Sequence, residues 1–300
     1  MYKAPVEDYQ FLYEHVIRLD QLMEQLGNDD VNTELAEAVL IEAGKLAEDV
    51  IAPLNHSGDM AGAMRLKNGH VKTPAGFAEA HGAMRDGGWS SMEAKAEFGG
   101  QNLPMTLTIA ANEFWQSANL AFALCHLLTQ GQICALQKSA SPDLQKIYIP
   151  PMVDGRWTGT MNLTEPQAGS DLAAIKSRAV PNGDHYLISG QKIYITYGEH
   201  DMADNIVHLV LARTPDAPPG IKGISVFIVP KFLPDNDGNF TQLNDLRCLS
   251  IEKKLGINGS PTAVMQFGET KGSVGYLVGH ENEGVDIMFG MMNHARIAVG

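Results

Sequence analysis

The sequence predicts an α+β protein with several domains: an all-helical N-terminal domain, an antiparallel β-sandwich or barrel, and the start of a C-terminal helical bundle. Three observations predict this order. Apolar residues recur at helical spacing in the first half, short β-branched and aromatic runs separated by turn residues follow, and helical spacing returns near the end. We therefore expect domains over residues 1–155, 156–280 and 281–300.

Length and composition fit a folded protein of about two full domains. The chain has 300 residues, 44% of them apolar, and a single core rarely grows much past ~250 residues. The 22 Lys and Arg residues against 35 Asp and Glu residues give a net charge of −13. Nucleic acids and anionic lipids attract basic surfaces, so this balance argues against nucleic-acid binding and against docking on a membrane.

The cysteines and the N-terminus indicate a reducing compartment. Cys125, Cys134 and Cys248 show neither disulfide nor metal-ligand spacing, so we expect no metal site, and Cys125 and Cys134 lie among apolar residues, as buried thiols do. The first residues lack the basic segment and apolar run of a secretory signal. Together these features predict a cytoplasmic protein.

The first strongly patterned helix is predicted over residues 34–50. Asn32 or Thr33 can cap its start, and its apolar residues form one broad face. Pro53 is expected to stop it.

A second helix has an equally clear start. Ser141 is a good cap, Pro142 suits the first turn, and Asp143 places a carboxylate near the positive end of the helix. Pro150 and Pro151 are expected to end this helix and to mark the domain boundary.

Residues 114–137 are long enough to span a bilayer and carry no formal charge. Polar side chains such as Asn119, His126 and Gln130 are spread through the segment, and they would lack hydrogen-bond partners in lipid. We therefore expect buried core helices and no membrane insertion.

Five short runs rich in β-branched and aromatic residues predict the strands of the second domain. The runs are 158–163, 186–196, 206–213, 224–229 and 262–267. No helical pattern lies between them, which favours an antiparallel sandwich or barrel over a doubly wound sheet.

Helical spacing returns after Gly284, where several methionines and other apolar residues recur every three to four positions. The pattern stops at Gly300 without a cap, so we expect the C-terminal bundle to be truncated.

The segment 164–171, Thr-Glu-Pro-Gln-Ala-Gly-Ser-Asp, follows the first predicted strand and is the most informative part of the chain. It resembles the signature of the acyl-CoA dehydrogenase family, flavoproteins that oxidise acyl-CoA thioesters between Cα and Cβ. Segments 191–196 and 97–104 resemble two further family motifs, which contact the flavin and border the acyl pocket. Tyr194 stands where many members have Trp, and Gln167 where Gly is frequent.

The resemblance implies that two β segments bind FAD. An isoalloxazine ring needs a few fixed polar partners and an apolar wall that excludes water. The hydroxyls of Thr164 and Thr196 suit the polar role, and Gly169 and Ser170 lie where the loop can approach a ligand closely. The expected cofactor-binding residues are Met161, Leu163, Thr164, Gly169, Ser170, Tyr194, Ile195 and Thr196.

The expected substrate-binding residues are Ser170, Asn293 and Arg296. The last two lie in a segment that resembles the start of a family helix that contacts the ligand. Arg296 can pair with a phosphate of CoA or form a structural ion pair, and the sequence leaves both open. His294 is expected at the surface.

The implied activity is FAD-dependent α,β-dehydrogenation of an acyl-CoA thioester to the trans-2-enoyl-CoA, a reaction of fatty-acid β-oxidation. The chain resembles the larger subgroup that uses long-chain or 3-methylmercaptopropionyl-CoA. The resemblance also implies electron-transfer flavoprotein as electron acceptor and a homodimer or homotetramer. No residue matches the catalytic glutamate, so we expect the base beyond Gly300 and an inactive 1–300 chain.

Two alternatives remain at this point: an acyl-CoA oxidase, and a non-catalytic relative that binds DNA, against which the net charge argues. A catalytic dyad of Glu165 and Asp171 is not expected, because such residues next to a turn more often hydrogen-bond their own loop.

Overall fold

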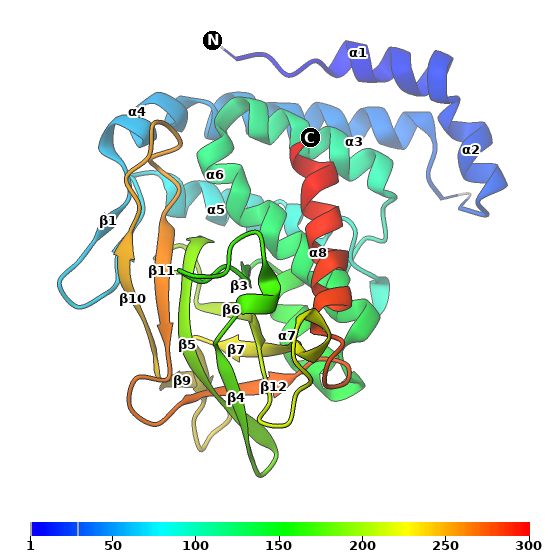
Figure 1. The fold of residues 1–300 in the computed structure, drawn as a ribbon. Helices are drawn as coiled ribbons and strands as arrows, with labels where there is room; N and C mark the ends of the chain where they lie inside the picture. The colour runs from blue at the N-terminus through cyan, green and yellow to red at the C-terminus, as the bar shows by residue number, and fades with distance from the viewer. Residues whose placement is uncertain (1, 29) are drawn as a thin grey trace.

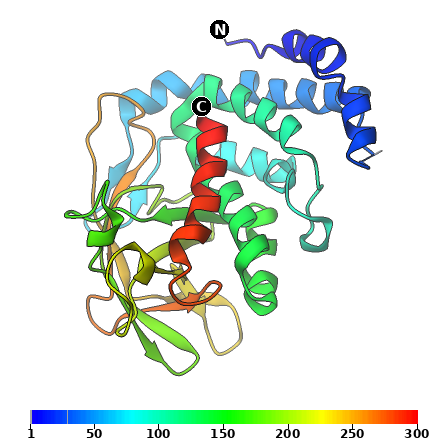
Figure 2. The same ribbon diagram turned by 45° about the vertical axis from the view of Figure 1, so that its right-hand side comes forward.

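A helical layer and a β-sheet layer lie against each other in the computed structural model, which describes residues 2–28 and 30–300 (Figure 1). The helical layer contains α1 (Val6–Phe11), η1 (Leu12–Ile17), α2 (Leu19–Gln25), α3 (Thr33–Leu46), η2 (Ala47–Ile51), α4 (Pro53–Ala61), α5 (Phe77–Asp86), η3 (Trp89–Ser91), η4 (Ala96–Phe98), α6 (Met105–Ser139) and α7 (Pro142–Val153). A short hairpin of β1 (Met64–Arg65) and β2 (Val71–Lys72) interrupts it. The turned view shows α1 and α2 at the outer edge of this layer, away from the sheet (Figure 2).

The start of α3 forms as the sequence predicts. The side chain of Asn32 accepts a hydrogen bond of 2.8 Å from the backbone N–H of Leu35, which makes Asn32 the cap. The predicted helix also ends before Pro53, at Ile51, but a further helix begins directly at that proline. After the π-helical turn η2, Pro53 occupies the first turn of α4, where the missing N–H of proline costs no hydrogen bond.

The long helix α6 is bent at Asn119, whose backbone leaves the helical region (φ −161°, ψ 90°). Its two arms are tied by a hydrogen bond of 3.0 Å that the side-chain amide of Asn112 donates to the side-chain oxygen of Gln130. By length and composition α6 is the one described helix that could cross a membrane, but 83% of its most apolar window is buried inside the protein. The predicted core helices are therefore confirmed, and their polar groups lie within the protein.

The end of α7 differs from the expectation. Pro150 and Pro151 lie inside the helix, which continues to Val153. Each proline removes one hydrogen bond, but Met152 and Val153 are buried and their packing holds the last turn in place.

The β layer is an eight-stranded sheet with β4 (Arg178–Asn182) paired to β5 (His185–Thr196). The main path runs β10-β11-β5-β12-β7-β6-β3. Its other strands are β3 (Trp157–Asn162), β6 (Asn205–Ala212), β7 (Ser225–Pro230), β10 (Leu246–Ile251), β11 (Thr262–Phe267) and β12 (Ser273–Leu277), and a separate pair is formed by β8 (Phe232–Pro234) and β9 (Phe240–Leu243).

The predicted fold class, a helical domain followed by a β-sheet domain, is confirmed, and all five predicted strands are present. One detail differs: β3 and β6 pair in parallel, while the other pairs of the sheet are antiparallel. The chain from β3 to β6 passes through β4 and β5, and this crossover is long enough to bring β6 back in the same direction.

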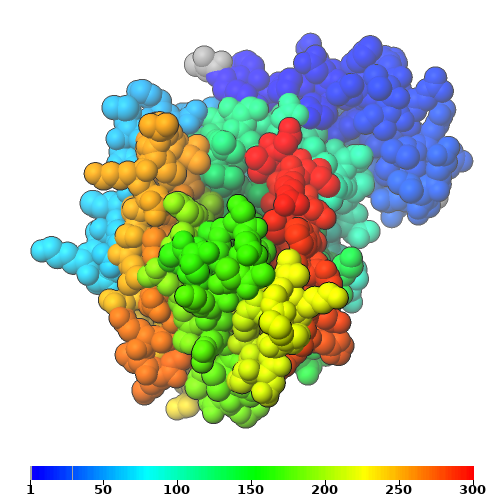
Figure 3. Space-filling view, in the orientation of Figure 1, coloured from blue at the N-terminus to red at the C-terminus, as the bar shows by residue number. Residues whose placement is uncertain are grey.

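The last helix, α8 (Gly284–Val299), packs against α6 and runs along the junction of the two layers. In the space-filling view it fills the surface between the β layer and the helical layer (Figure 3). Met288 and Met291 are buried on its inner face, as their spacing predicts.

A buried ion pair ties the loop after β3 to β5. The ammonium of Lys192 lies 2.8 Å from Glu165 Oε1 and donates a second bond of 2.9 Å to the carbonyl of Leu163. Glu165 also accepts the backbone N–H groups of Lys176 and Ser177. Burial alone would raise the pKa of Glu165, but Lys192 and these donors outweigh it and lower the pKa to about 2. Burial lowers the pKa of Lys192 to about 8 although Glu165 opposes the shift, and this value still lies above neutral pH, so the ion-paired form prevails there.

Replacing the helix cap tests the first helix boundary. Asn32→Ala is expected to lower the free energy of unfolding by about 1 kcal/mol, because the Leu35 N–H loses its acceptor. Urea denaturation measures this. Asn236→Ala, at an exposed loop position, is the control and should be neutral; equal effects would contradict the cap.

Breaking the buried ion pair should cost more. Lys192→Met leaves the Glu165 carboxylate buried without its cation, with an expected loss of about 3–5 kcal/mol in urea denaturation. Adding Glu165→Gln should recover part of the loss. Arg247→Met breaks a half-exposed pair with Glu269 and should cost less than about 1 kcal/mol; a similar cost for both single variants would argue against the role of the buried pair.

Candidate functional site

The two segments predicted to form one site are hydrogen-bonded neighbours. The backbone N–H of Ile193, in β5, donates a bond of 2.9 Å to the carbonyl of Thr164. The Glu165–Lys192 ion pair joins the same two segments through the residue after Thr164 and the residue before Ile193. The loop 164–171 is thus fixed against β5 by its own backbone and by a buried charge pair.

A β-bulge shapes β5 at this point. The register between β5 and β11 shifts between Ala263 and Met265, opposite residues 192–195. Tyr194 lies in this bulge with a φ of 60°, a conformation that is rare for an aromatic residue. Its side chain is 62% exposed, whereas the next residue, Ile195, is buried. The bulge therefore turns an aromatic ring outward beside the loop.

A cavity of about 410 Å³ lies between the loop, β3, β5 and α8. Eight of the predicted site residues line it: Met161, Leu163, Thr164, Gly169, Ser170, Tyr194, Ile195 and Arg296. Leu172, Phe289 and Met292 line it as well and were not predicted. The apolar spacing of Phe289 and Met292 on α8, three residues apart and in phase with Arg296, is the signal that marks them as part of this face.

Two predicted residues are not among the lining residues of this cavity. Thr196 lies at the end of β5, where it pairs with Thr262 of β11. Asn293 lines a different cavity of about 500 Å³ between α6 and α8. Successive helix residues are about 100° apart, so Asn293 faces away from Met292 and toward this second cavity.

The lining is mostly apolar, and its polar side-chain groups are the hydroxyls of Thr164, Ser170 and Tyr194 and the guanidinium of Arg296. That guanidinium donates a bond of 3.2 Å to the side chain of Asn293 and lies over the ring of Phe289. Such a lining suits a flat apolar group with polar edges and an anionic extension.

The lining of this cavity contains no carboxylate. Glu165 is held by Lys192 and backbone donors, and Asp171 accepts the backbone N–H of Ala173 at 2.9 Å. Asp171 thus bonds close to its own loop, whereas Glu165 bonds mainly to Lys192 of β5 and to the backbone before β4.

Two family models match consecutive parts of the chain. The model of the acyl-CoA dehydrogenase N-terminal domain matches residues 33–156, and that of the acyl-CoA dehydrogenase middle domain matches residues 160–270. The boundary between them coincides with the change from helices to strands.

Curated relatives match the whole length of the chain. It is 48% identical over 300 residues to 3-methylmercaptopropionyl-CoA dehydrogenase of Ruegeria pomeroyi, covering 100% of this chain and 50% of the relative. It is 35% identical over 295 residues to butyryl-CoA dehydrogenase of Syntrophomonas wolfei, covering 95% and 47%. The chain thus spans about half the length of these relatives.

The fold is also found among solved structures. A structure described as the electron transferring flavoprotein of Acidaminococcus fermentans aligns with a TM-score of 0.73 at 28% identity, over 90% of this chain and 64% of that chain. Sequence and structure agree, and the chain therefore belongs to the acyl-CoA dehydrogenase family, of which it contains the N-terminal and middle domains.

Proposed function

We propose that this chain provides the flavin-facing half of an acyl-CoA dehydrogenase site, for oxidation of an acyl-CoA thioester to the trans-2-enoyl-CoA. Members of this family are FAD-dependent flavoproteins. The observation that carries the proposal is the convergence of eight predicted residues, from segments as far apart as 161 and 296, on one cavity.

The side chains that line the cavity match the apolar faces and the polar edge of a flavin ring. Met161, Leu163 and Ile195 provide apolar walls, and Tyr194 adds an aromatic face at the rim. The hydroxyl of Thr164 can both donate and accept, as the polar edge of the ring requires. When bound, FAD supplies the two-electron acceptor for the hydrogen that leaves Cβ.

The substrate would enter beside the same loop. Ser170 is exposed on the cavity lining and can hydrogen-bond a thioester or pantetheine oxygen. Arg296 offers a cation to a phosphate, which matters in a chain with a net charge of −13. Asn293 would act through its bond to Arg296 and would orient that guanidinium.

Proton abstraction from Cα would need a base from elsewhere, since no carboxylate lines the cavity. The role of the described residues is then to bind, to orient and to exclude water. In the whole enzyme we expect electron-transfer flavoprotein as the acceptor, a cytoplasmic location and a homodimer or homotetramer.

Flavin binding can be tested at the Thr164 hydroxyl. The purified chain is expected to bind FAD weakly, and Thr164→Val to weaken binding by about three- to tenfold, because a hydrogen bond contributes roughly 0.5–1.5 kcal/mol. Quenching of flavin fluorescence measures the affinity. Thr262→Val is a matched control outside the cavity lining. Equal affinities in all three proteins would place the flavin elsewhere.

Turnover can be tested separately. The FAD-loaded chain is expected to keep its flavin absorbance after addition of butyryl-CoA or 3-methylmercaptopropionyl-CoA, because no base faces the cavity. Dithionite should bleach the same sample and so show that the flavin is reducible. Rapid bleaching by either thioester would show that a base is present within this chain.

A further inference from the structure

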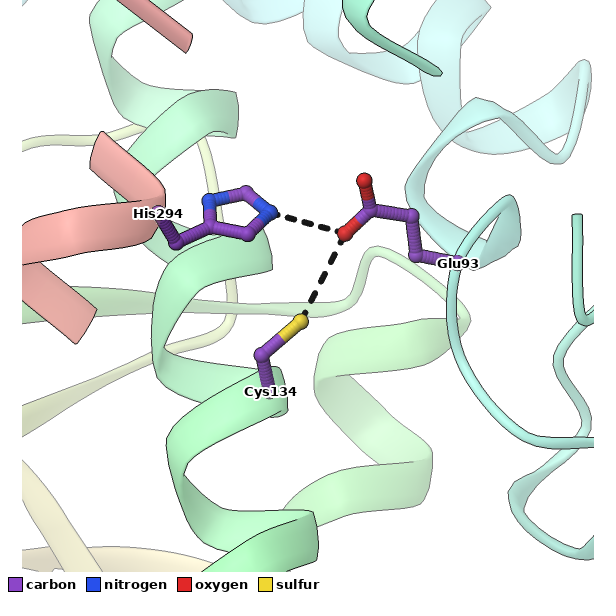
Figure 4. A group of neighbouring side chains, drawn as sticks. All are labelled: Glu93, Cys134 and His294. Carbon is purple, nitrogen blue, oxygen red and sulfur yellow. Dashed lines mark hydrogen bonds and ion pairs between the residues drawn. The ribbon is translucent and has the colours of Figure 1, made fainter. Parts of the chain in front are cut away.

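Three potential metal ligands meet at the junction of the helical layer and α8, outside the cavity described above. Glu93 lies in the segment between η3 and η4, Cys134 in the second arm of α6, and His294 in α8. One ligand atom from each lies within 4.8 Å of the other two. Figure 4 shows the three side chains pointing toward one another from these elements.

The expectation of a surface position for His294 is wrong. Its ring is buried, and its Nε2 lies 2.7 Å from Glu93 Oε2. The thiol of Cys134 donates to the same oxygen at 3.5 Å, and the hydroxyl of Thr108 bonds to the other carboxylate oxygen. Glu93 therefore accepts three hydrogen bonds in a nearly enclosed site.

We propose that Glu93, Cys134 and His294 bind one zinc ion, which clasps α8 to α6 and to the segment between η3 and η4. The proposal does not depend on flavin or acyl-CoA binding.

The donor set selects the metal. One imidazole nitrogen, one thiolate sulfur and one carboxylate oxygen suit Zn²⁺, whereas Ca²⁺ and Mg²⁺ take oxygen ligands. Zn²⁺ with two anionic ligands and one neutral ligand is also electrically neutral as a whole, which lowers the cost of burying the charges.

The two ligand spacings that involve Glu93 are close to those of a zinc site. Zinc–ligand bonds of roughly 2.0–2.3 Å in a tetrahedron place neighbouring ligand atoms about 3.3–3.7 Å apart. The distance of 3.5 Å between Cys134 Sγ and Glu93 Oε2 already fits. The 2.7 Å between His294 and Glu93 must open by roughly half an ångström, as one hydrogen bond gives way to two metal bonds.

A fourth position and an entry path are available. Cys134 and His294 line the cavity of about 500 Å³ between α6 and α8, from which a water molecule can complete the tetrahedron. Glu283 and Asp286 line the same cavity together with Lys138, so its charged lining carries two carboxylates against one ammonium. The Thr108 hydroxyl fixes the ligating carboxylate from behind.

Binding requires proton release. In this structure the Cys134 thiol carries its proton and donates it toward Glu93 Oε2. On binding, the S–H bond breaks, the Zn–S bond forms and the proton goes to solvent. The imidazole must present a lone pair at Nε2, so a proton on that nitrogen leaves or moves to Nδ1.

The test uses the purified, reduced and chelator-treated chain, and zinc chloride as probe. After desalting, metal analysis is expected to find one zinc per chain, with an affinity in chelator competition that falls at least about tenfold in Cys134→Ser and in His294→Gln. Cys248→Ser is the control, since its hydroxyl can keep the bond to the Ser250 carbonyl. Equal zinc in all four proteins, or none in the unmodified chain, would overturn the proposal.

A measurement on the unmodified chain covers the case in which a variant fails to fold. Cobalt in place of zinc should give a thiolate-to-metal absorption band in the near ultraviolet, together with release of a proton into a weakly buffered solution. Zinc should also raise the melting temperature, because the ion binds only the folded arrangement of three distant segments. Absence of the cobalt band would mean that the three side chains form a hydrogen-bonded cluster without metal.

Discussion

The buried pair of Glu165 and Lys192 is the interaction on which the site depends. A charge pair with nearly no exposure is stable only if every partner is in place. Glu165 is therefore tied to β5 through Lys192 and to the start of β4 through two backbone N–H groups. Those bonds fix both ends of the loop that carries Gly169 and Ser170. The loop is thereby held against β5, with Gly169 and Ser170 on the lining of the cavity that α8 closes from the other side.

The helical layer supplies the second constraint. The bend of α6 at Asn119 brings its two arms together, and the Asn112–Gln130 bond holds them. α8 packs on this bent helix and so presents one face to the cavity beside the loop 164–171 and another to the cavity between α6 and α8. Arg296 and Asn293 are only three residues apart and are hydrogen-bonded to each other, yet they line different cavities.

Sequence reasoning predicted what depends on local pattern. The Asn32 cap and the five strands are local features, and the structure contains them. The segment 164–171 is also local, and several of its residues line the cavity. Short strands such as β4 and β8 were missed, since their residues form no run long enough to show alternation, and the parallel pairing of β3 with β6 depends on the path of the chain. The prolines at 150 and 151 were misjudged, because the tolerance of proline inside a helix depends on the packing of the residues around it. Glu93, Cys134 and His294 have no common spacing, so only the folded chain shows them together.

The left-handed backbone of Tyr194 has a consequence for how β5 tolerates change. Glycine would relax the main chain there but would delete the ring at the rim of the cavity, whereas any other side chain keeps the same unfavourable dihedral angle. At this position a residue that relieves the backbone strain therefore cannot also supply the aromatic ring. Libraries of variants at residue 194 should accordingly separate into thermally robust proteins without an aromatic rim and less robust ones that retain it.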